Sequence, residues 1–307
     1  MGLLKLVPAE TKIDFIGKRF FAFAFTLLLF FVAIGSLSVM GLNMGIDFRG
    51  GILIDATSQA GAVDVHSLRG KMQTLGLGEV ALQTFGNENT VLIRVQQQEG
   101  GDTANAAAIE RIKTALGEGW TYNRSESVGP TVGNELLHDG ILATLLAIGA
   151  ITLYVAVRFE WQFGIAALAS TFHDVFVSLG LVLVLGWEFN LTTVAALLLL
   201  SGYSVNDTVI VFDRIREDLR RYKQRDLKDI INLSVNATLS RTTMTSGLTM
   251  LAILPMLFLG GETLINFTGV ITWGIIVGTF SSIYVAAALL LYLPPLRMGR
   301  TVQSAAA

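Results

Sequence analysis

The sequence contains no cysteine and only 3 histidines. The first absence excludes disulfide bonds, thiolate nucleophiles and cysteine-ligated metals, and the isolated His66, His138 and His173 cannot supply a histidine cluster. Charged residues are also scarce, at 15% of the chain, whereas apolar residues make up 52% and occur in long runs. This composition is typical of a polytopic membrane protein and not of a soluble enzyme, and we expect no metal, no organic cofactor and no enzymatic activity.

The amino-terminal end carries basic residues ahead of the first apolar run. Residues 1–19 include Lys18 and Arg19, and the run Phe20–Met40 follows directly. A secretory signal peptide would have a shorter apolar core and a small-residue cleavage site. We therefore predict a first transmembrane helix at residues 20–40, with its basic end in the cytoplasm.

Residues 41–137 have lower hydropathy and contain no glycine-rich phosphate loop. Apolar residues at every second position predict strands, and those at three- and four-residue spacing predict helices. The resulting β-α-β-β-α-β order is the ferredoxin-like pattern, in which both helices cover one face of an antiparallel sheet, and a binding or mechanical role suits it. The predicted elements are strand Ile46–Thr57, helix Val63–Leu75, strands Glu79–Phe85 and Thr90–Gln97, helix Thr103–Leu116 and strand Trp120–Val128.

The remainder of the chain is mostly apolar and predicts five further spans within residues 138–293. A polar link at residues 213–241 is rich in Lys and Arg, which favours a cytoplasmic position. Six spans then place residues 1–19 and 294–307 in the cytoplasm and residues 41–137 on the other side. The predicted spans are Asp139–Val157, Trp161–Leu185, Leu191–Phe212, Met244–Leu259 and Leu264–Leu293.

The fourth predicted span contains an acid, Asp207. It follows Asn206 and precedes Asp213 by six residues, or about 9 Å along a helix, so it lies inside the hydrocarbon. An ionisable group at this depth is costly and predicts a functional site. In the alternative interpretation, Asp207 ends the span early and its carboxylate reaches the interface, but residues 208–212 are apolar enough to continue the span.

Two further polar features belong to the membrane region. His173 and Asp174 fall near the middle of the third predicted span, where they form either an interhelical hydrogen-bond pair or part of a proton path. Arg241 begins the fifth span on the side toward which Asp207 lies, and it could reach Asp207 if these two spans pack together. Burial and a nearby guanidinium act in opposite directions on the protonation of a carboxyl group, so a change of helix position could load and release a proton.

Short motifs are distributed over nearly the whole chain. They are GIDFRGG at 45–51, with Gly45, Asp47, Gly50 and Gly51; VGPTVG at 128–133, with Gly129 and Pro130; GYSVND at 202–207; DRIRE at 213–217; SRT at 240–242; and TSG at 245–247. In this order they resemble the SecF family, the smaller membrane subunits of the SecD/SecF protein-export complex within the resistance-nodulation-division superfamily. The joint order is far more specific than any single motif.

The resemblance implies a multi-pass protein of the bacterial inner membrane that is surrounded by membrane lipid and has a periplasmic ferredoxin-like domain. It implies a SecD partner, association with the SecYEG translocon, and use of the proton-motive force to draw exported unfolded polypeptide across the membrane at a late step. It also implies that Asp207 and Arg241 belong to a proton pathway, with His173, Asp174 and Asn206 as further candidates. The implied coupling ion is H⁺, although a carboxylate with hydroxyl neighbours suits Na⁺ as well.

Other functions remain open at this point. A resistance-nodulation-division-type exporter of a small molecule or lipid would have a substrate cavity and need no translocon, and a non-catalytic assembly subunit would use Asp207 only as an interhelical contact. The basic link suggests nucleic acid or an anionic lipid surface. It alternates its basic residues with acids such as Asp226 and Asp229, so we expect a solvated interfacial helix and no nucleic acid.

Overall fold

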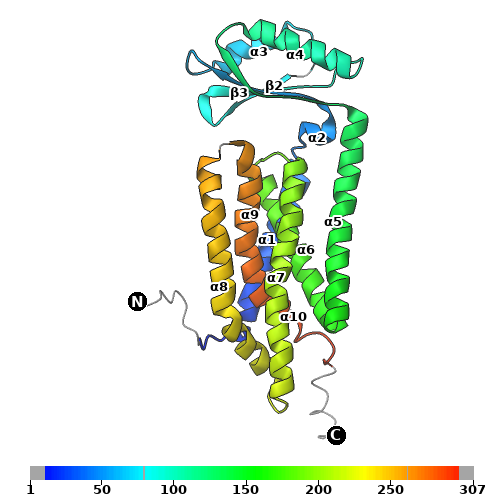
Figure 1. Ribbon diagram of the computed structural model, residues 1–307, viewed down its shortest axis with the longest axis vertical. Helices are drawn as coiled ribbons and strands as arrows, with labels where there is room; N and C mark the ends of the chain where they lie inside the picture. The colour runs from blue at the N-terminus through cyan, green and yellow to red at the C-terminus, as the bar shows by residue number, and fades with distance from the viewer. Residues whose placement is uncertain (1–10, 79, 261, 297–307) are drawn as a thin grey trace.

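The computed structural model describes residues 11–78, 80–260 and 262–296. Within these residues, 6 helices are long and apolar enough to cross a membrane, which confirms the predicted number of spans. They form a bundle, and a small sheet domain lies over one end of it (Figure 1). The spans consist mainly of α1 (Arg19–Met40), α5 (Pro130–Arg158), α6 (Trp161–Val184), α7 (Leu191–Arg221), α8 (Leu227–Leu259) and α9 (Glu262–Ser281), and the last span continues past α9 to Leu289.

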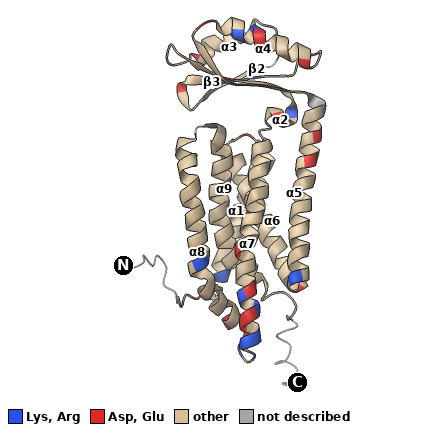
Figure 2. Ribbon diagram, in the orientation of Figure 1, with Lys and Arg blue, Asp and Glu red and all other residues tan. Residues whose placement is uncertain are grey.

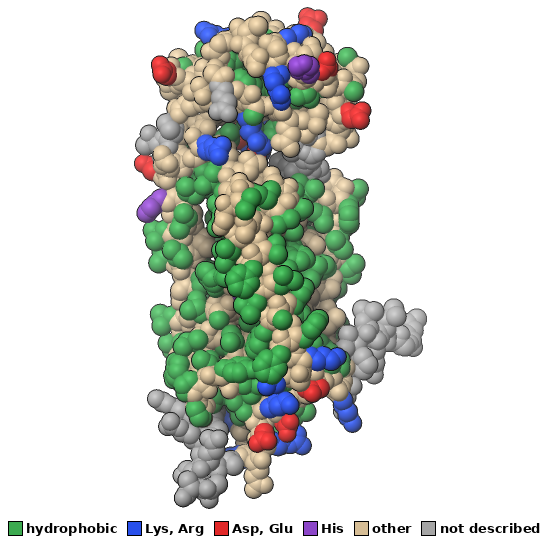
Figure 3. All heavy atoms as spheres, turned by 180° about the vertical axis from the view of Figure 1, so that it is seen from behind, with side chains coloured by type: hydrophobic (Ala, Val, Ile, Leu, Met, Phe, Trp, Pro, Cys, Tyr) green, Lys and Arg blue, Asp and Glu red, His purple; other side chains and the backbone are tan. Residues whose placement is uncertain are grey.

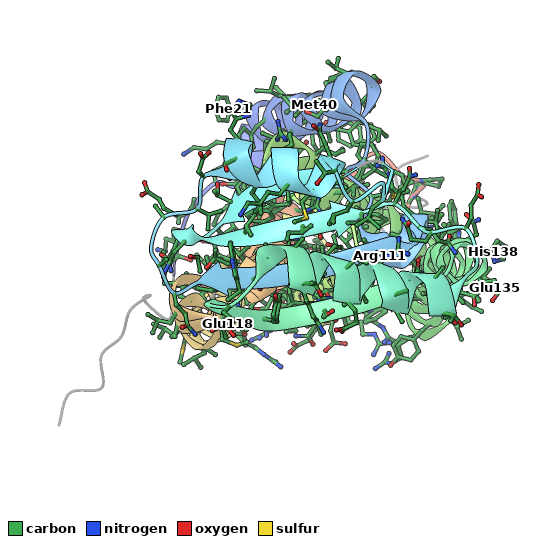
Figure 4. The ribbon with its side chains drawn as sticks, turned by 90° about the horizontal axis from the view of Figure 1, so that it is seen from above. Phe21, Met40, Arg111, Glu118, Glu135 and His138 are labelled. Carbon is green, nitrogen blue, oxygen red and sulfur yellow. The ribbon has the colours of Figure 1, made fainter. Side chains whose placement is uncertain are left out.

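The sheet domain is built from four antiparallel strands in the order β2-β3-β1-β4. Its two long helices lie on the face away from the bundle (Figure 1), and a view from above shows both of them crossing the sheet (Figure 4). This arrangement is consistent with the predicted ferredoxin-like pattern. The elements are β1 (Gly51–Ser58), α3 (Val65–Gln73), β2 (Val80–Phe85), β3 (Asn87–Val95), α4 (Asp102–Leu116) and β4 (Trp120–Val128).

The domain has its own apolar core between the sheet and its helices. Ile52 and Ile54 of β1, Ile93 of β3, Met72 of α3 and Ile112 of α4 are all fully buried there. Alternate residues of a strand point to one face, and residues three and four apart on a helix share a face, so these two periodicities define the core. The domain therefore has the packing of a separate folding unit beside the membrane bundle.

Residues 46–49 form the short helix α2 (Ile46–Arg49), so the prediction of a strand from residue 46 was wrong at its start. Gly50 ends α2 with a positive φ of 73°, and Gly51 follows with a φ of 124°. A Cβ on Gly51 would lie 2.6 Å from the carbonyl oxygen of Val95 on β3. Glycine tolerates these two conformations, which other residues rarely adopt. Gly50 thus separates α2 from β1, and Gly51, the first residue of β1, lets the strand approach β3.

Helices α6, α7 and α9 are the most buried spans, whereas α1, α5 and α8 lie outside them. Charged side chains occur mainly in the sheet domain and at helix ends (Figure 2), and a broad apolar surface covers the face of the bundle seen in Figure 3. Such a surface suits the hydrocarbon of a bilayer. Viewed from above (Figure 4), α1, with Phe21 and Met40, and α5, with Glu135 and His138, lie beyond different edges of the sheet.

The predicted polar link at residues 213–241 is helical over most of its length. Helix α7 continues to Arg221 and α8 begins at Leu227, so only residues 222–226 lie between them. Ile230 and Ile231 at the start of α8 are buried in the same core as Phe212 of α7. The fifth span is therefore the second half of a longer helix, whose first part packs against the extension of α7.

A buried acid joins the two helices of this extension. Asp218 of α7 is fully buried, and one of its carboxylate oxygens accepts hydrogen bonds from Ser234 Oγ of α8 at 2.9 Å and from Arg214 Nε at 3.1 Å. The guanidinium of Arg214 is partly exposed and also contacts Glu217 at 3.0 Å. Asp218 thus holds the start of α8 against α7 beyond the apolar part of the bundle.

Candidate functional site

Asp207 lies inside the bundle, where α7, α8 and α9 meet. Its residue surface is 1% exposed, and its Oδ2 lies 3.4 Å from the hydroxyl of Ser246 on α8. The same hydroxyl is 2.8 Å from Thr279 Oγ1 on α9 and 3.4 Å from the Tyr203 hydroxyl on α7. The acid therefore faces a small group of hydroxyls contributed by three helices.

The second carboxylate oxygen of Asp207, Oδ1, is buried and has no hydrogen-bond partner in the described part of the chain. A buried carboxylate with an unsatisfied oxygen is costly, and a proton or a small cation bound there would lower that cost. The arrangement can therefore take up and release a cation, and it provides no nucleophile or metal-ligand cluster within the described residues.

Arg241 and Asn206, which the sequence predicted beside Asp207, point outward. Arg241 is exposed and lines a shallow groove along α8 with Met244 and Thr245. Among the described residues it forms no direct ion pair with Asp207, although its charge acts on the Asp207 carboxyl at longer range. Asn206 is exposed on α7 although its neighbour in sequence is buried. Of these three residues, the structure brings only Asp207 into the interior.

His173 and Asp174 of α6 form a second buried polar group. Asp174 is fully buried, and its Oδ2 accepts hydrogen bonds from Ser204 Oγ of α7 at 2.5 Å and Ser281 Oγ of α9 at 2.6 Å. His173 Nδ1 lies 3.0 Å from Asp174 Oδ1. Sequence reasoning did not find Ser281 as a partner of Asp174, or Thr279 as the contact of the Ser246 hydroxyl beside Asp207. The signal that could have indicated them is the series of small and hydroxyl residues along α9.

The GIDFRGG motif connects the sheet domain to the first turn of α7, the helix that carries Asp207. Asp47 Oδ2 accepts a hydrogen bond from the backbone N–H of Leu191 at 2.9 Å, and Gly45 N–H donates to the Phe189 carbonyl at 2.9 Å. A carboxylate at a helix amino terminus satisfies a free N–H and is favoured by the helix dipole. Asp47 therefore holds the outer end of α7, just before which Asn190 provides a second cap.

The VGPTVG motif packs against α2, the short helix that carries Asp47. Gly129 precedes α5 as its amino-terminal cap residue, and Pro130 is the first residue of the helix, where its missing N–H has no cost. A Cβ on Gly133 would lie 2.8 Å from the carbonyl oxygen of Phe48 in α2. Helix α5 thus begins earlier than the predicted span at residue 139, and it begins in contact with α2.

A cleft of about 330 Å³ separates the lower face of the sheet from the outer ends of the helices. An ion pair between Arg94 of β3 and Glu188, which lies between α6 and α7, crosses it. Burial, with a smaller contribution from Arg49, lowers the pKa of Arg94 from its usual value. The guanidinium remains charged at neutral pH because its usual pKa is so high. The sheet domain is thus joined to the α6–α7 connection by charge as well as by Asp47.

We expect Asp47→Ala to destabilise the membrane domain modestly, by about 1 kcal/mol, because loss of a capping carboxylate typically costs that much. The measurement is thermal unfolding of the purified protein in detergent. Asp64→Ala is a matched control, since Asp64 caps α3 in the sheet domain with bonds to the N–H groups of His66 and Ser67. The control should lower the stability of the sheet domain alone. Equal protection of Leu191 N–H from hydrogen exchange in Asp47→Ala and the native chain would contradict the capping role.

Two protein-family models match parts of this chain. Residues 108–295 match the family model described as protein export membrane protein SecD/SecF, C-terminal, and residues 35–62 match the SecD/SecF GG motif. The chain belongs to the SecD/SecF family. The SecD/SecF regions matched include the glycine pair after α2 and the buried acids Asp174, Asp207 and Asp218.

Relatives within the SecD/SecF family cover most of the chain. It is 41% identical over 305 residues to the protein translocase subunit SecF of Rhodobacter capsulatus, with 94% of this chain and 91% of the relative covered. The identity to the protein translocase subunit SecF of Rickettsia felis is 40% over 291 residues, with 94% of each chain covered. The resemblance to SecF seen in the motifs is confirmed.

Solved structures of SecDF have the same fold. The chain superimposes on SecDF from Thermus thermophilus, described as a translocon-associated membrane protein, with a TM-score of 0.84 and 37% identity over 94% of this chain. A second SecDF structure, in a super-membrane-facing form, gives a TM-score of 0.68 and 36% identity over 99% of this chain. The chain spans 39% and 41% of those two solved chains. It is a multi-pass membrane protein of the SecD/SecF type.

Proposed function

We propose that this chain is the SecF-type subunit of a SecD/SecF complex that assists the SecYEG translocon at a late step of protein export across the bacterial inner membrane. The complex uses the proton-motive force to help draw the unfolded polypeptide out. The names of the curated relatives support this role over export of a small molecule or lipid. The sheet domain faces the periplasm, and both termini lie in the cytoplasm.

The observation that carries the proposal is the environment of Asp207. Its carboxylate is buried at the junction of three spans, one oxygen has no partner among the described residues, and the nearby groups are hydroxyls. Each proton that crosses the membrane releases about 2.3 kcal/mol per 100 mV, which corresponds to about 50-fold in a two-state equilibrium. Reversible protonation of Asp207 can therefore supply a useful fraction of the work of translocation.

The orientation rests on the distribution of charge. Basic side chains gather at the end of the bundle away from the sheet (Figure 2), on the extensions of α7 and α8. Short basic segments next to spans remain in the cytoplasm, whereas whole domains cross largely regardless of charge. The charge distribution therefore supports a periplasmic position for the sheet domain.

A SecD partner is supported by the outward face of α7. Ala195, Leu199, Gly202 and Asn206 are exposed and share one side of the helix. An asparagine facing lipid inside a span is costly, whereas small residues allow another helix to approach closely. A second membrane subunit packed on this face would cover Asn206, which gives that residue a role at the subunit interface.

We expect Asp207→Asn to abolish the part of export that depends on the proton gradient. Asparagine has nearly the same shape as aspartate but cannot bind or release a proton at physiological pH. The measurement is release of a secreted polypeptide from spheroplasts, with and without a protonophore, at equal levels of the complex. The protonophore should slow release by the native chain, and the variant should be equally slow in both conditions.

Asp213→Asn is the matched control, because it makes the same chemical change on an exposed position of the same helix. It should leave release as fast and as sensitive to the protonophore as in the native chain. Fast, protonophore-sensitive release by Asp207→Asn would overturn the proposed function and leave Asp207 as an interhelical contact. A Na⁺ gradient that replaces the proton gradient in the native chain would assign Na⁺ as the coupling ion.

A further inference from the structure

A second carboxylate, separate from Asp207, holds three spans together. Asp174 of α6 is fully buried and receives hydrogen bonds from one serine on α7 and one on α9, Ser204 and Ser281. Ser170, one turn earlier on α6, lies 3.1 Å from Ser281. The oxygen–oxygen distances are 2.5 and 2.6 Å, so two hydroxyl donors satisfy the same carboxylate oxygen of Asp174.

The imidazole of His173 lies beside this carboxylate. Its Nδ1 lies 3.0 Å from Asp174 Oδ1, and only 11% of the side chain is exposed. Its other ring nitrogen, Nε2, is buried and has no hydrogen-bond partner among the described residues. An imidazole next to a carboxylate can carry a proton near neutral pH, and an unsatisfied ring nitrogen inside a bundle is available to a water molecule that brings or removes it.

The two buried acids are connected through α7. Ser204, which donates to Asp174, precedes Asp207 by three residues, or about 4.5 Å along the helix axis. One turn after Ser204, the Thr208 hydroxyl lies 2.9 Å from Ser282 Oγ. The same segment of α7 thus contacts α6 through Ser204, α8 through Asp207 and the turn that follows α9 through Thr208.

The last span departs from α-helical geometry at this level. The π-helical turn η2 (Ser282–Ala286) begins directly after Ser281. Two consecutive serines consequently reach different helices, since Ser281 contacts Asp174 on α6 and Ser282 contacts Thr208 on α7. Single π-helical turns inside α-helices occur frequently at functional sites. The junction between α9 and η2 therefore contacts α6 through Ser281 and α7 through Ser282.

We propose that His173 and Asp174 form a second proton-binding site, in series with Asp207 and joined to it through Ser204. The inference rests on the proposed proton-driven function and adds a second proton-binding site to it. Asp174 lies nearer the sheet domain than Asp207, because Ser204 is closer to the outer end of α7. A proton entering from that side meets the His173–Asp174 pair first, and its arrival at Asp174 replaces a charged acceptor of two serines by a neutral acid.

Few other ionisable groups surround this pair. Within the described residues of the spans that pack on α6, the acidic and basic side chains other than Asp207 lie at helix ends. The remaining titratable groups on these spans are His138 near the start of α5 and the phenols of Tyr154 on α5, Tyr203 on α7 and Tyr284 in η2. A change of protonation in this region can therefore be assigned to His173, Asp174 or Asp207.

Infrared difference spectroscopy of the purified complex in lipid, recorded over a pH series, tests the inference directly. We expect two protonated-carboxyl bands to appear as the pH falls, one lost in Asp174→Asn and the other lost in Asp207→Asn. His173→Gln keeps a hydrogen-bond donor next to Asp174 but cannot hold the proton, so it should move the pH at which the Asp174 band appears. Ser178→Ala, one turn further along α6 at an equally buried position, should change neither band.

The outcomes separate this inference from the proposed function. If Asp174→Asn folds, retains both bands and supports protonophore-sensitive export, Asp174 is a structural contact and the inference is wrong. If Asp174→Asn does not fold, an Asp174 band that His173→Gln leaves unmoved overturns the inference in the same way. A lost Asp174 band together with normal export by Asp207→Asn would instead overturn the proposed function and leave the second site intact.

Discussion

Replacing Gly180 by leucine is expected to separate α1 from α6 and to leave little folded protein. A Cβ at Gly180 would lie 2.5 Å from the Ala33 Cβ and 3.1 Å from its Cα, so the backbone of α1 would have to move. Close contact between small residues is a main source of helix association in membranes, and overpacking of such a contact costs about 1 to 3 kcal/mol or more. We expect an effect at the upper end of this range, because a whole helix depends on the contact.

The measurement is the yield of monodisperse protein in detergent, followed by thermal unfolding with tryptophan fluorescence. Gly149→Leu is the control, since no atom lies within 4 Å of a Cβ built on that glycine of α5. The control should fold as well as the native chain, because the added side chain points into open space. Normal yield and unchanged unfolding of Gly180→Leu would show that α1 does not pack on α6 in this way.

Replacing Asp218 by alanine is expected to destabilise the hairpin between α7 and α8 by about 1.5 to 3 kcal/mol, the usual contribution of a hydrogen bond to a charged group. The substitution leaves Ser234 without its carboxylate acceptor and Arg214 without its buried partner. The free energy of unfolding can be obtained from denaturant titration in mixed micelles. Hydrogen exchange should show the loss first at Ile230 and Ile231, which pack beside this contact.

Glu217→Ala provides the comparison, since it removes an acid that contacts the same Arg214 at 3.0 Å but is 61% exposed. Exposed ion pairs contribute about 0 to 1 kcal/mol, so this variant should be nearly as stable as the native chain. Equal losses in the two variants would mean that the charge of Arg214, and not the burial of Asp218, determines the stability of the hairpin.

Much of the fold could be predicted because the relevant signals are local. Long apolar runs indicate spans whatever their neighbours are, and the strand and helix periods of the sheet domain follow from which face is buried. The start of the strand predicted from Ile46 was wrong because Gly50 and Gly51 adopt conformations that the alternating pattern does not reveal. The boundary of α8 was also missed, since Ile230 and Ile231 are buried by tertiary contacts in a segment that is polar on average.

The site could be predicted only in part. The depth of Asp207 follows from its position within one apolar run, so its burial was accessible from the sequence. Which neighbours it meets depends on how the helices rotate about their axes, and this is set by packing over the whole bundle. For that reason Arg241 and Asn206, close to Asp207 in the motifs, face outward, while Ser246 and Thr279 from two other helices lie beside it.

The contact between Asp47 and Leu191 mechanically couples α7 and the sheet domain in both directions. Because α2 leads through two glycines into the central strand β1, a displacement of α7 along its axis also displaces the sheet domain. Coupling between two sites is reciprocal in free energy. If a proton at Asp207 shifts α7, a load pulling on the sheet domain must alter the free energy of protonating Asp207 by the same amount. Proton uptake at Asp207 would then depend on the force that the exported polypeptide exerts on the sheet domain, just as protonation would exert a force on that domain.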